Sequence, residues 1–178
     1  DTMANARVAR RYARAVFDIA VAHSDLDDWL RDLHTMREAL AQPNIMLLLE
    51  NPKLPPADKR RLVAQMLNGL APLRLNLVSV LIENGRIELL PEVVAEFERL
   101  YNEYNNIAEA TITTAIPLDE AETERVREQL QQITGKRIIL HHRVDPSILG
   151  GVIAQVGDRV INGSLAARLE ALRAEMTR

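Results

Sequence analysis

The chain has 178 residues, of which 47% are hydrophobic and 26% charged, and its formal net charge at pH 7 is -3. This composition is typical of a globular protein with one mid-sized domain or two small ones, and no apolar run reaches the roughly 18 residues that a membrane-spanning helix needs. The weakly acidic balance argues against a dedicated nucleic-acid binder, and the absence of cysteine excludes disulfides, thiolate catalysis and cysteine metal sites.

The first segment of the sequence combines an apolar stripe with basic residues on its other side. Val8, Tyr12, Val16 and Ile19 recur at helical spacing. This pattern predicts a helix of a packed bundle with a solvated, charged face. The alternatives are a helix that lies on a membrane surface and a cleavable targeting segment, although the segment lacks the apolar centre of a secretory signal.

Five further stretches in the first hundred residues repeat the helical spacing, and few β-branched runs interrupt them. Prolines suit the first turns of several of these helices, and Gly85 is predicted to be a structural turn that ends the fifth helix of the chain. The apolar stripes of the five helices lie within residues 29–40, 45–49, 62–67, 73–82 and 93–104. The first part of the chain is therefore predicted to be a six-helix bundle.

The fifth helix of the chain, over residues 72–83, is apolar on two nearly opposite sides. Leu77 and Val80 lie on one side, and Val78 and Ile82 lie on the other. A helix with this pattern is either buried at the centre of a bundle or packs its own bundle with one face and a partner with the other.

Near residue 105 the helical spacing gives way to alternation, which is typical of a strand. Ala110 and Ile112 lie on one face of this strand. Asp119, with Glu122 three positions later, resembles a capping box that starts another helix. A second strand, a hairpin and a final helix follow, so this part predicts a small α+β unit.

The predicted fold class is mainly α, with a helical bundle over residues 1–105 and a small α+β domain over residues 106–178. In the second domain the predicted order is strand, helix, strand, hairpin and helix. The domain boundary is placed where polar residues separate the last bundle helix from the first strand.

Glycines are frequent between Gly150 and Leu172, which raises the possibility of a phosphate-binding loop. A Walker-type loop needs a lysine directly before its serine or threonine, and no lysine precedes Ser164. The flanking apolar runs instead predict that Gly157 and Asp158 form the tip of a hairpin. Gly163 and Ser164 are then the entry to the last helix, so all four are predicted to be structural turn residues.

The sequence contains no arrangement of residues that favours catalysis. His141 and His142 are adjacent in a predicted strand and point to opposite faces, so they are poorly placed to bind one metal ion. The acidic run over residues 119–124 is explained by the start of a helix, where negative charge complements the helix dipole. We expect no catalytic residue, no metal site and no cofactor.

Three stretches of the sequence together resemble the delta subunit of F-type ATP synthases, whose mitochondrial counterpart is the oligomycin-sensitivity conferring protein. They read ARRYARAVFDIA, ENGRIELLPEVVAEF and GGVIAQVGDRVINGSLAARLEAL, and the last is the most specific. The likeness covers essentially the whole chain. Among its departures, Arg11 stands where the family commonly has proline.

This resemblance implies a non-catalytic stator subunit of the peripheral stalk. The implied partners are the N-terminal helix of an alpha subunit of the catalytic head, bound by the helical bundle, and the C-terminal ends of the b subunits, joined by the second domain. Neither nucleic acid nor direct membrane insertion is expected. The implied location is peripheral, on the cytoplasmic face of a bacterial inner membrane or its plastid thylakoid equivalent.

The resemblance and the two-sided fifth helix together suggest a groove for the alpha-subunit helix. Its candidate residues are Tyr12, Ala15, Leu77 and Val80, with Tyr12 as an aromatic anchor and Ala15 allowing close helix approach. The candidates for contact with the b subunits lie in the last predicted helix: Arg168, Leu169 and Leu172. A generic helical adaptor and a small nucleotide-binding enzyme are the alternative functions.

Overall fold

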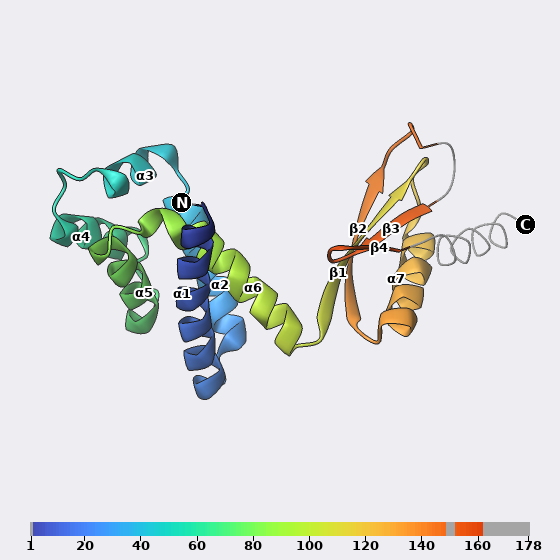
Figure 1. Cartoon of the computed structure of the whole chain (residues 1–178), viewed down its shortest axis with the longest axis horizontal. Helices are drawn as coiled ribbons and strands as arrows, with labels where there is room; N and C mark the ends of the chain where they lie inside the picture. The colour runs from blue at the N-terminus through green and yellow to red at the C-terminus, as the bar shows by residue number, and fades with distance from the viewer. Residues whose placement is uncertain (1, 149–151, 162–178) are drawn as a thin grey trace, which may run out of the picture. The chain divides into compact units, whose positions relative to one another are not determined.

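The computed structural model describes residues 2–148 and 152–161 of the chain, and Figure 1 shows its helices and strands. The chain divides into two compact units, Asp1–Tyr101 and Asn102–Arg178. The described residues are mainly helical, with a small four-stranded sheet in the second unit. The prediction of a mainly α chain with a small sheet in its second part is confirmed at this level.

The first unit is helical throughout. Its elements are α1 (Thr2–His23), α2 (Leu26–Leu40), α3 (Pro43–Glu50), α4 (Pro56–Met66), α5 (Pro72–Glu83), the short 3-10 helix η1 (Ile87–Leu89) and α6 (Leu90–Tyr104). The helices α3, α4 and α5 each begin at a proline, whose fixed φ suits the first helical turn. The helical spacing in the sequence does not predict η1 before α6.

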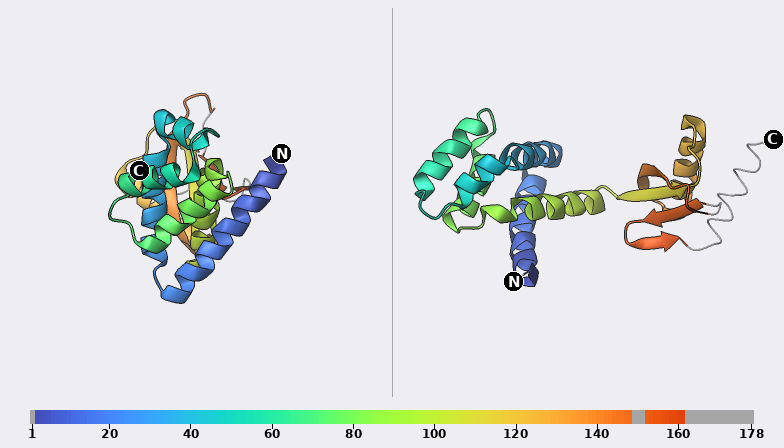
Figure 2. Two further views of the ribbon diagram at one scale, coloured as in Figure 1. Left: turned by 90° about the vertical axis from the view of Figure 1, so that its left-hand side faces the viewer. Right: turned by 90° about the horizontal axis from the view of Figure 1, so that it is seen from above.

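The core of the helical unit is built from large side chains that are almost completely buried. Trp29, Leu33 and Met36 of α2 are each no more than 1% exposed. In Figures 1 and 2 helix α1 crosses α6, and there the rings of Phe17 and Phe97 pack edge to face with their centroids 5.7 Å apart. Such a pair contributes about 1 kcal/mol beyond its buried area, which helps to fix the crossing.

Helix α5 is buried on both of its apolar sides. Leu77 is 7% exposed and Val78 is fully buried, while Leu73 and Val80 are 37% and 42% exposed. The two-sided pattern therefore serves mainly the unit's own core, and a narrow strip of the helix remains at the surface.

A buried cation holds α5 against α2. Arg74 is 6% exposed, and it donates hydrogen bonds from Nη2 to Oδ2 of Asp25 (2.8 Å) and from Nε to Oδ2 of Asp32 (3.1 Å). Its guanidinium also lies over the ring of Trp29. A charge at this depth is tolerated because two carboxylates and an aromatic face replace the water that it loses.

The second unit pairs a four-stranded sheet with one described helix. Its elements are β1 (Ile107–Thr114), α7 (Glu120–Thr134), β2 (Arg137–Val144), β3 (Val152–Val156) and β4 (Arg159–Ile161). The strand order is β2-β1-β3-β4, in which β1 runs parallel to β2 and antiparallel to β3. The parallel pair requires a crossover connection, and α7 supplies it.

The ends of α7 follow the chemistry that its sequence predicts. The Asp119 carboxylate accepts a hydrogen bond from the backbone N–H of Glu122 (2.7 Å), and the Glu122 side chain accepts one from the N–H of Asp119 (2.9 Å), which confirms the capping box. Gly135 ends the helix at a φ of 66°, in the left-handed region.

One face of the sheet forms the core of the second unit. Ala110 and Ile112 of β1 are buried against Leu130 of α7, together with Ile138 and Ala154 of the neighbouring strands. This cluster is much smaller than the core of the helical unit. The second unit therefore depends strongly on each of its few buried side chains.

The hairpin between β3 and β4 turns at Gly157 and Asp158, with a φ of 56° at Gly157. Gly163, Ser164 and the candidate contact residues Arg168, Leu169 and Leu172 lie outside the described residues. Within residues 2–148 and 152–161, no helix combines the length and the apolar character needed to cross a bilayer.

Candidate protein-binding site

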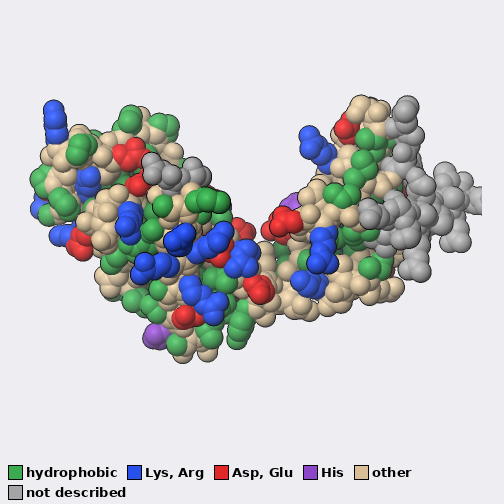
Figure 3. Space-filling model, in the orientation of Figure 1, with side chains coloured by type: hydrophobic (Ala, Val, Ile, Leu, Met, Phe, Trp, Pro, Cys, Tyr) green, Lys and Arg blue, Asp and Glu red, His purple; other side chains and the backbone are tan. Residues whose placement is uncertain are grey.

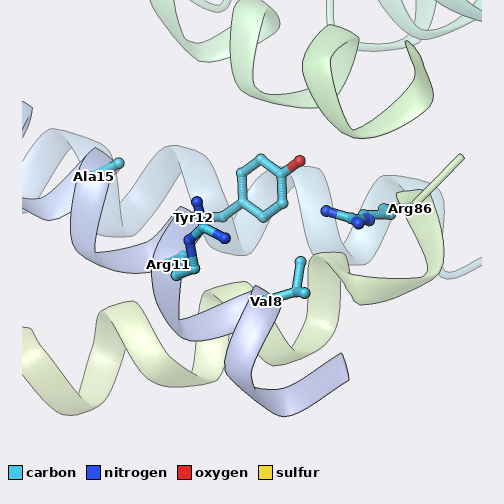
Figure 4. Close-up of a pocket in the computed structure, with 5 residues that line it drawn as sticks. All are labelled: Val8, Arg11, Tyr12, Ala15 and Arg86. Atoms are coloured by element: carbon cyan, nitrogen blue, oxygen red, sulfur yellow. The ribbon is translucent and has the colours of Figure 1, made fainter. Parts of the chain in front are cut away.

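A cavity of about 270 Å³ opens between α1 and the turn that follows α5. Five residues line it: Val8, Arg11, Tyr12, Ala15 and Arg86. Figure 4 shows the ring of Tyr12 between the side chains of Arg11 and Arg86. We call this feature the Tyr12 cavity.

Helix α1 supplies most of the lining because it carries a second apolar stripe beside the one that packs in the core. Val8, Tyr12 and Ala15 follow one another at spacings of four and three residues, which places them on one side of the helix. Val8 and Tyr12 are half-buried and Ala15 is exposed. The neighbouring stripe, with Ala13 and Phe17, is buried in the core.

The other wall of the cavity depends on how α5 ends. Gly85 adopts a φ of 61°, its N–H donates to the carbonyl of Ile82 (3.0 Å), and the N–H of Arg86 donates to the carbonyl of Leu81 (2.8 Å). This pair of bonds is a Schellman motif, which requires a left-handed residue after the helix. It turns the chain so that Ile87 is buried, at 2% exposed, while Arg86 lines the cavity.

The structure brings together two of the four residues expected in the groove. Tyr12 and Ala15 line the same cavity. Val80 is exposed on α5 but is not part of the lining, and Leu77 is buried in the core, where it packs within the helical unit. The helical period alone does not distinguish Leu77 from Val80, because both residues lie on apolar sides of α5.

Three lining residues were not among the candidates from the sequence: Val8, Arg11 and Arg86. Val8 was assigned to the core stripe of α1, although the core uses the neighbouring alanines instead. Arg86 could have been noticed from its position, because it directly follows the glycine that ends α5. Arg11 has only its place beside Tyr12 as a signal.

The surface around the Tyr12 cavity is strongly basic. Helix α1 carries Arg7, Arg10, Arg11 and Arg14, and its single acidic residue is Asp18, whose Oδ1 lies 3.3 Å from Nε of Arg14. Figure 3 shows Lys and Arg side chains gathered on the face of the helical unit along which α1 runs. The local charge is thus opposite in sign to the net charge of the whole chain.

The described part of the chain holds no group of three or more His, Asp or Glu residues placed to bind a metal ion. The Thr114 hydroxyl donates to the carbonyl of Ile116 (2.6 Å) and lies 2.6 Å from Nε2 of His142. Since the hydroxyl proton is used on the carbonyl, the imidazole Nε2 must be the donor to Thr114. His142 therefore acts in this structure as a link between β1 and β2.

A second apolar surface lies on the sheet of the second unit. The strand register places Ile139, Ile153 and Val160 on the face opposite Ile112 and α7. These three side chains are between 39% and 61% exposed. Exposed β-branched residues that share one face are a candidate contact surface.

Comparisons with known proteins point to one family over nearly the whole chain. Residues 8–176 match the family model described as ATP synthase delta (OSCP) subunit. ATP synthase subunit delta of Dehalococcoides mccartyi is 36% identical over 170 residues, which cover 96% of this chain and 94% of the relative. That of Heliobacterium modesticaldum is 34% identical over 178 residues, covering 99% of this chain and 96% of the relative.

A solved structure gives the same result. A chain in the cryo-EM structure of the Toxoplasma gondii mitochondrial ATP synthase hexamer is similar with a TM-score of 0.64 and 26% identity, covering 96% of this chain and 97% of that one. The resemblance inferred from the three sequence stretches is thereby confirmed. The chain belongs to the ATP synthase delta (OSCP) subunit family, and it is a structural subunit of the peripheral stalk, not a catalytic one.

Proposed function

We propose that this chain acts as the stator link of a rotary F-type ATP synthase by binding a different partner with each of its two units. The helical unit binds the N-terminal helix of an alpha subunit of the catalytic head. The second unit binds the C-terminal ends of the b subunits. Held at both ends, the chain keeps the head from turning with the rotor during proton-driven ATP synthesis.

The Tyr12 cavity carries the first half of this proposal. An amphipathic helix that docks in a groove needs an apolar stripe on the receiving surface and room for close approach. Val8 and Tyr12 supply the stripe, and Ala15 supplies the room because its side chain is a single methyl group. Tyr12 is half-buried in the free chain, so a partner would complete the burial of an aromatic anchor.

The second half rests on the family resemblance and on the second sheet face. Ile139, Ile153 and Val160 offer apolar area outside the core of the second unit. The residues proposed from the sequence for this contact, in the stretch 168–172, belong to the part of the chain that the structure does not describe. We propose that the chain associates with the cytoplasmic face of a bacterial inner membrane, or its plastid equivalent, through these partners.

A mechanical role fits the chemistry of the described residues. The two units have separate cores, so each unit can bind its partner while the other unit keeps its own fold. A six-helix bundle as the head-binding module, over residues 1–105, remains part of this proposal. The stalk-binding module would then span residues 106–178.

The head-binding half is tested by titrating a synthetic peptide of the alpha-subunit N-terminal segment from the same source into the full chain, by calorimetry. Tyr12→Ala should weaken binding by about 2 kcal/mol, or roughly 30-fold. The control is Tyr104→Ala, which removes a tyrosine that is 61% exposed on α6 and does not line the cavity. Equal affinities for the two variants would contradict the assignment of the cavity.

The stalk-binding half is tested with a chain truncated after Gly163. Capture of the b-subunit ends by the full chain but not by the truncated chain supports a contact in the last 15 or so residues, whose periodic leucines suit a helix–helix interface. Capture by both chains would exclude that region. In that case Ile153→Lys and Val160→Lys would show whether the second sheet face is used.

A further inference from the structure

Two guanidinium groups from different elements meet at the Tyr12 cavity. Arg11 comes from the middle of α1, and Arg86 comes from the Schellman turn after α5. In Figure 4 the side chain of Arg86 points toward the ring of Tyr12 from the side opposite Arg11. The cavity is therefore an apolar stripe with a positive charge on either side.

Neither guanidinium forms a hydrogen bond or ion pair with any residue that the structure describes. Many other arginines of the chain do so. The paired ones include Arg14 with Asp18, Arg31 with Asp28, Arg60 with Glu83, Arg61 with Asp58, Arg74 with Asp25, Arg99 with Glu96 and Arg127 with Glu124. Arg11 and Arg86 thus retain their full capacity to donate hydrogen bonds toward the cavity.

The position of Arg11 also carries a cost for the isolated chain. Arg7 and Arg14 lie four residues before it and three residues after it, and like charges at these spacings destabilise a helix. An anion that binds beside Arg11 would offset this repulsion.

We infer that the helix bound at the Tyr12 cavity places a carboxylate, from an Asp or Glu at the border of its apolar stripe, beside the ring of Tyr12 and within reach of Arg11 and Arg86. This inference rests on the proposed function and adds the partner chemistry of the same site. Guanidinium groups bind carboxylates through paired, charge-assisted hydrogen bonds. The carboxylate sets the rotation and register of the docked helix, because the apolar stripe by itself tolerates sliding by one turn.

The form of the cavity favours a protein helix over a phosphate surface. Val8, Tyr12 and Ala15 lie among the charges and would be left in contact with water by a nucleic-acid backbone. The net charge of -3 also opposes long-range attraction to nucleic acid or to an anionic lipid surface. Two separated guanidinium groups that flank one aromatic ring match a single carboxylate better than a continuous anionic surface.

The test uses the full chain and the catalytic head of the ATP synthase from the same source, with affinity measured at low and high salt. The double variant Arg11→Gln with Arg86→Gln should bind roughly 10- to 100-fold more weakly than the unchanged chain at low salt. The difference should shrink at high salt, because the lost interaction is partly screened. Arg7→Gln is the matched control, since it removes an exposed charge from the same helix outside the cavity, and its affinity should change less than about twofold.

A charge exchange identifies the partner group. Arg86→Glu should weaken binding further than Arg86→Gln, because it opposes the incoming carboxylate. Each Asp and Glu in the bound alpha-subunit segment is then changed to Lys in turn. One of these changes should restore the affinity of the Arg86→Glu chain and weaken that of the unchanged chain.

The outcomes separate this inference from the proposed function. If the unchanged chain does not bind the head, the proposed function fails. The carboxylate inference alone is overturned by a different result. In that result the chain binds the head and Tyr12→Ala weakens this binding, but Arg11→Gln with Arg86→Gln has the same affinity as Arg7→Gln. Arginine-dependent binding to vesicles of phosphatidylcholine with phosphatidylglycerol, or to a DNA duplex, with no such dependence for the head, would overturn it in favour of a phosphate surface.

Discussion

The guanidinium carbon of Arg74 lies 4.2 Å from the centroid of the Trp29 ring, so helix α5 is fixed to α2 by a cation that stacks on an aromatic face. The same side chain binds Asp25 and Asp32, and those two carboxylates retain only 24% and 15% of their side-chain exposure. The three groups form one buried network. Nε of the exposed Arg31 also lies 3.8 Å from Oδ1 of Asp32, so removing Arg74 leaves Asp25 without its cation and Asp32 with this surface partner alone.

Arg74→Met should therefore lower the free energy of unfolding by about 3 kcal/mol, measured by urea denaturation at neutral pH. Arg61→Met is the control, because the Arg61–Asp58 pair lies on the surface with side chains 71% and 45% exposed. Its loss should cost less than about 0.5 kcal/mol. Similar losses for the two variants would show that the Arg74 network contributes no more than a surface ion pair.

Replacing Gly85 tests the turn that carries Arg86 to the cavity. A Cβ added at Gly85 would meet no heavy atom within 4 Å, so the cost of Gly85→Ala comes from its φ of 61° alone. That cost is about 1 kcal/mol for a residue with a Cβ. The melting temperature of Gly85→Asn should be closer to that of the unchanged chain, because asparagine tolerates the left-handed region. An alanine variant as stable as the unchanged chain would contradict the importance of this turn.

Glu96 on α6 should make the stability of the helical unit depend on pH. The hydrogen bonds from Arg99 to its carboxylate lower the pKa of Glu96, and the charges of Arg99 and Arg10 act in the same direction against partial desolvation. A lowered folded-state pKa means that this stabilisation is complete above the unfolded-state value, near 4.5, and is lost as the pH falls through the folded-state pKa.

Glu96→Gln should accordingly cost about 0.5 kcal/mol at pH 7, and the difference from the unchanged chain should be smaller at about pH 3. Urea unfolding at the two pH values measures this. A difference that persists undiminished at the acidic pH would mean that the amide perturbs packing and not charge.

How much of this structure can be predicted from the sequence depends on how far apart along the chain the interacting residues lie. The capping box of Asp119 and Glu122 spans three positions, so its chemistry is visible in the sequence and is confirmed. The contacts of Arg74 span 42 and 49 positions, and a helical period cannot show that an arginine among leucines faces two carboxylates of α2. The same reason applies to Arg11 and Arg86, because their place on one cavity depends on how α1 lies beside the end of α5.

Family resemblance and local pattern also contributed differently to the candidate site. Tyr12 was selected as an aromatic anchor and Ala15 as a small residue that allows close helix approach, and both line the cavity. Leu77 was selected from the two-sided pattern of α5, but 7% exposure places it in the core. An apolar period indicates which sides of a helix avoid water and does not indicate whether the cover comes from the same chain or from a partner.

The two units should respond separately to damage in their cores. Ile112 is fully buried in the small cluster of the second unit, so Ile112→Ala should cost that unit about 3 kcal/mol. Trp29 is the only tryptophan of the chain and lies in the helical unit, so its fluorescence reports the unfolding of that unit alone. Ile112→Ala should move the circular dichroism transition of the sheet to lower urea and leave the Trp29 transition in place.

Leu33→Ala provides the opposite case, because Leu33 is fully buried in the helical unit. It should lower the urea midpoint of the Trp29 transition while the transition of the sheet is retained. If either substitution shifts both transitions by the same amount, the chain unfolds as one cooperative body. That result would contradict separate cores, and with them the proposal that each end of the link can hold its partner independently.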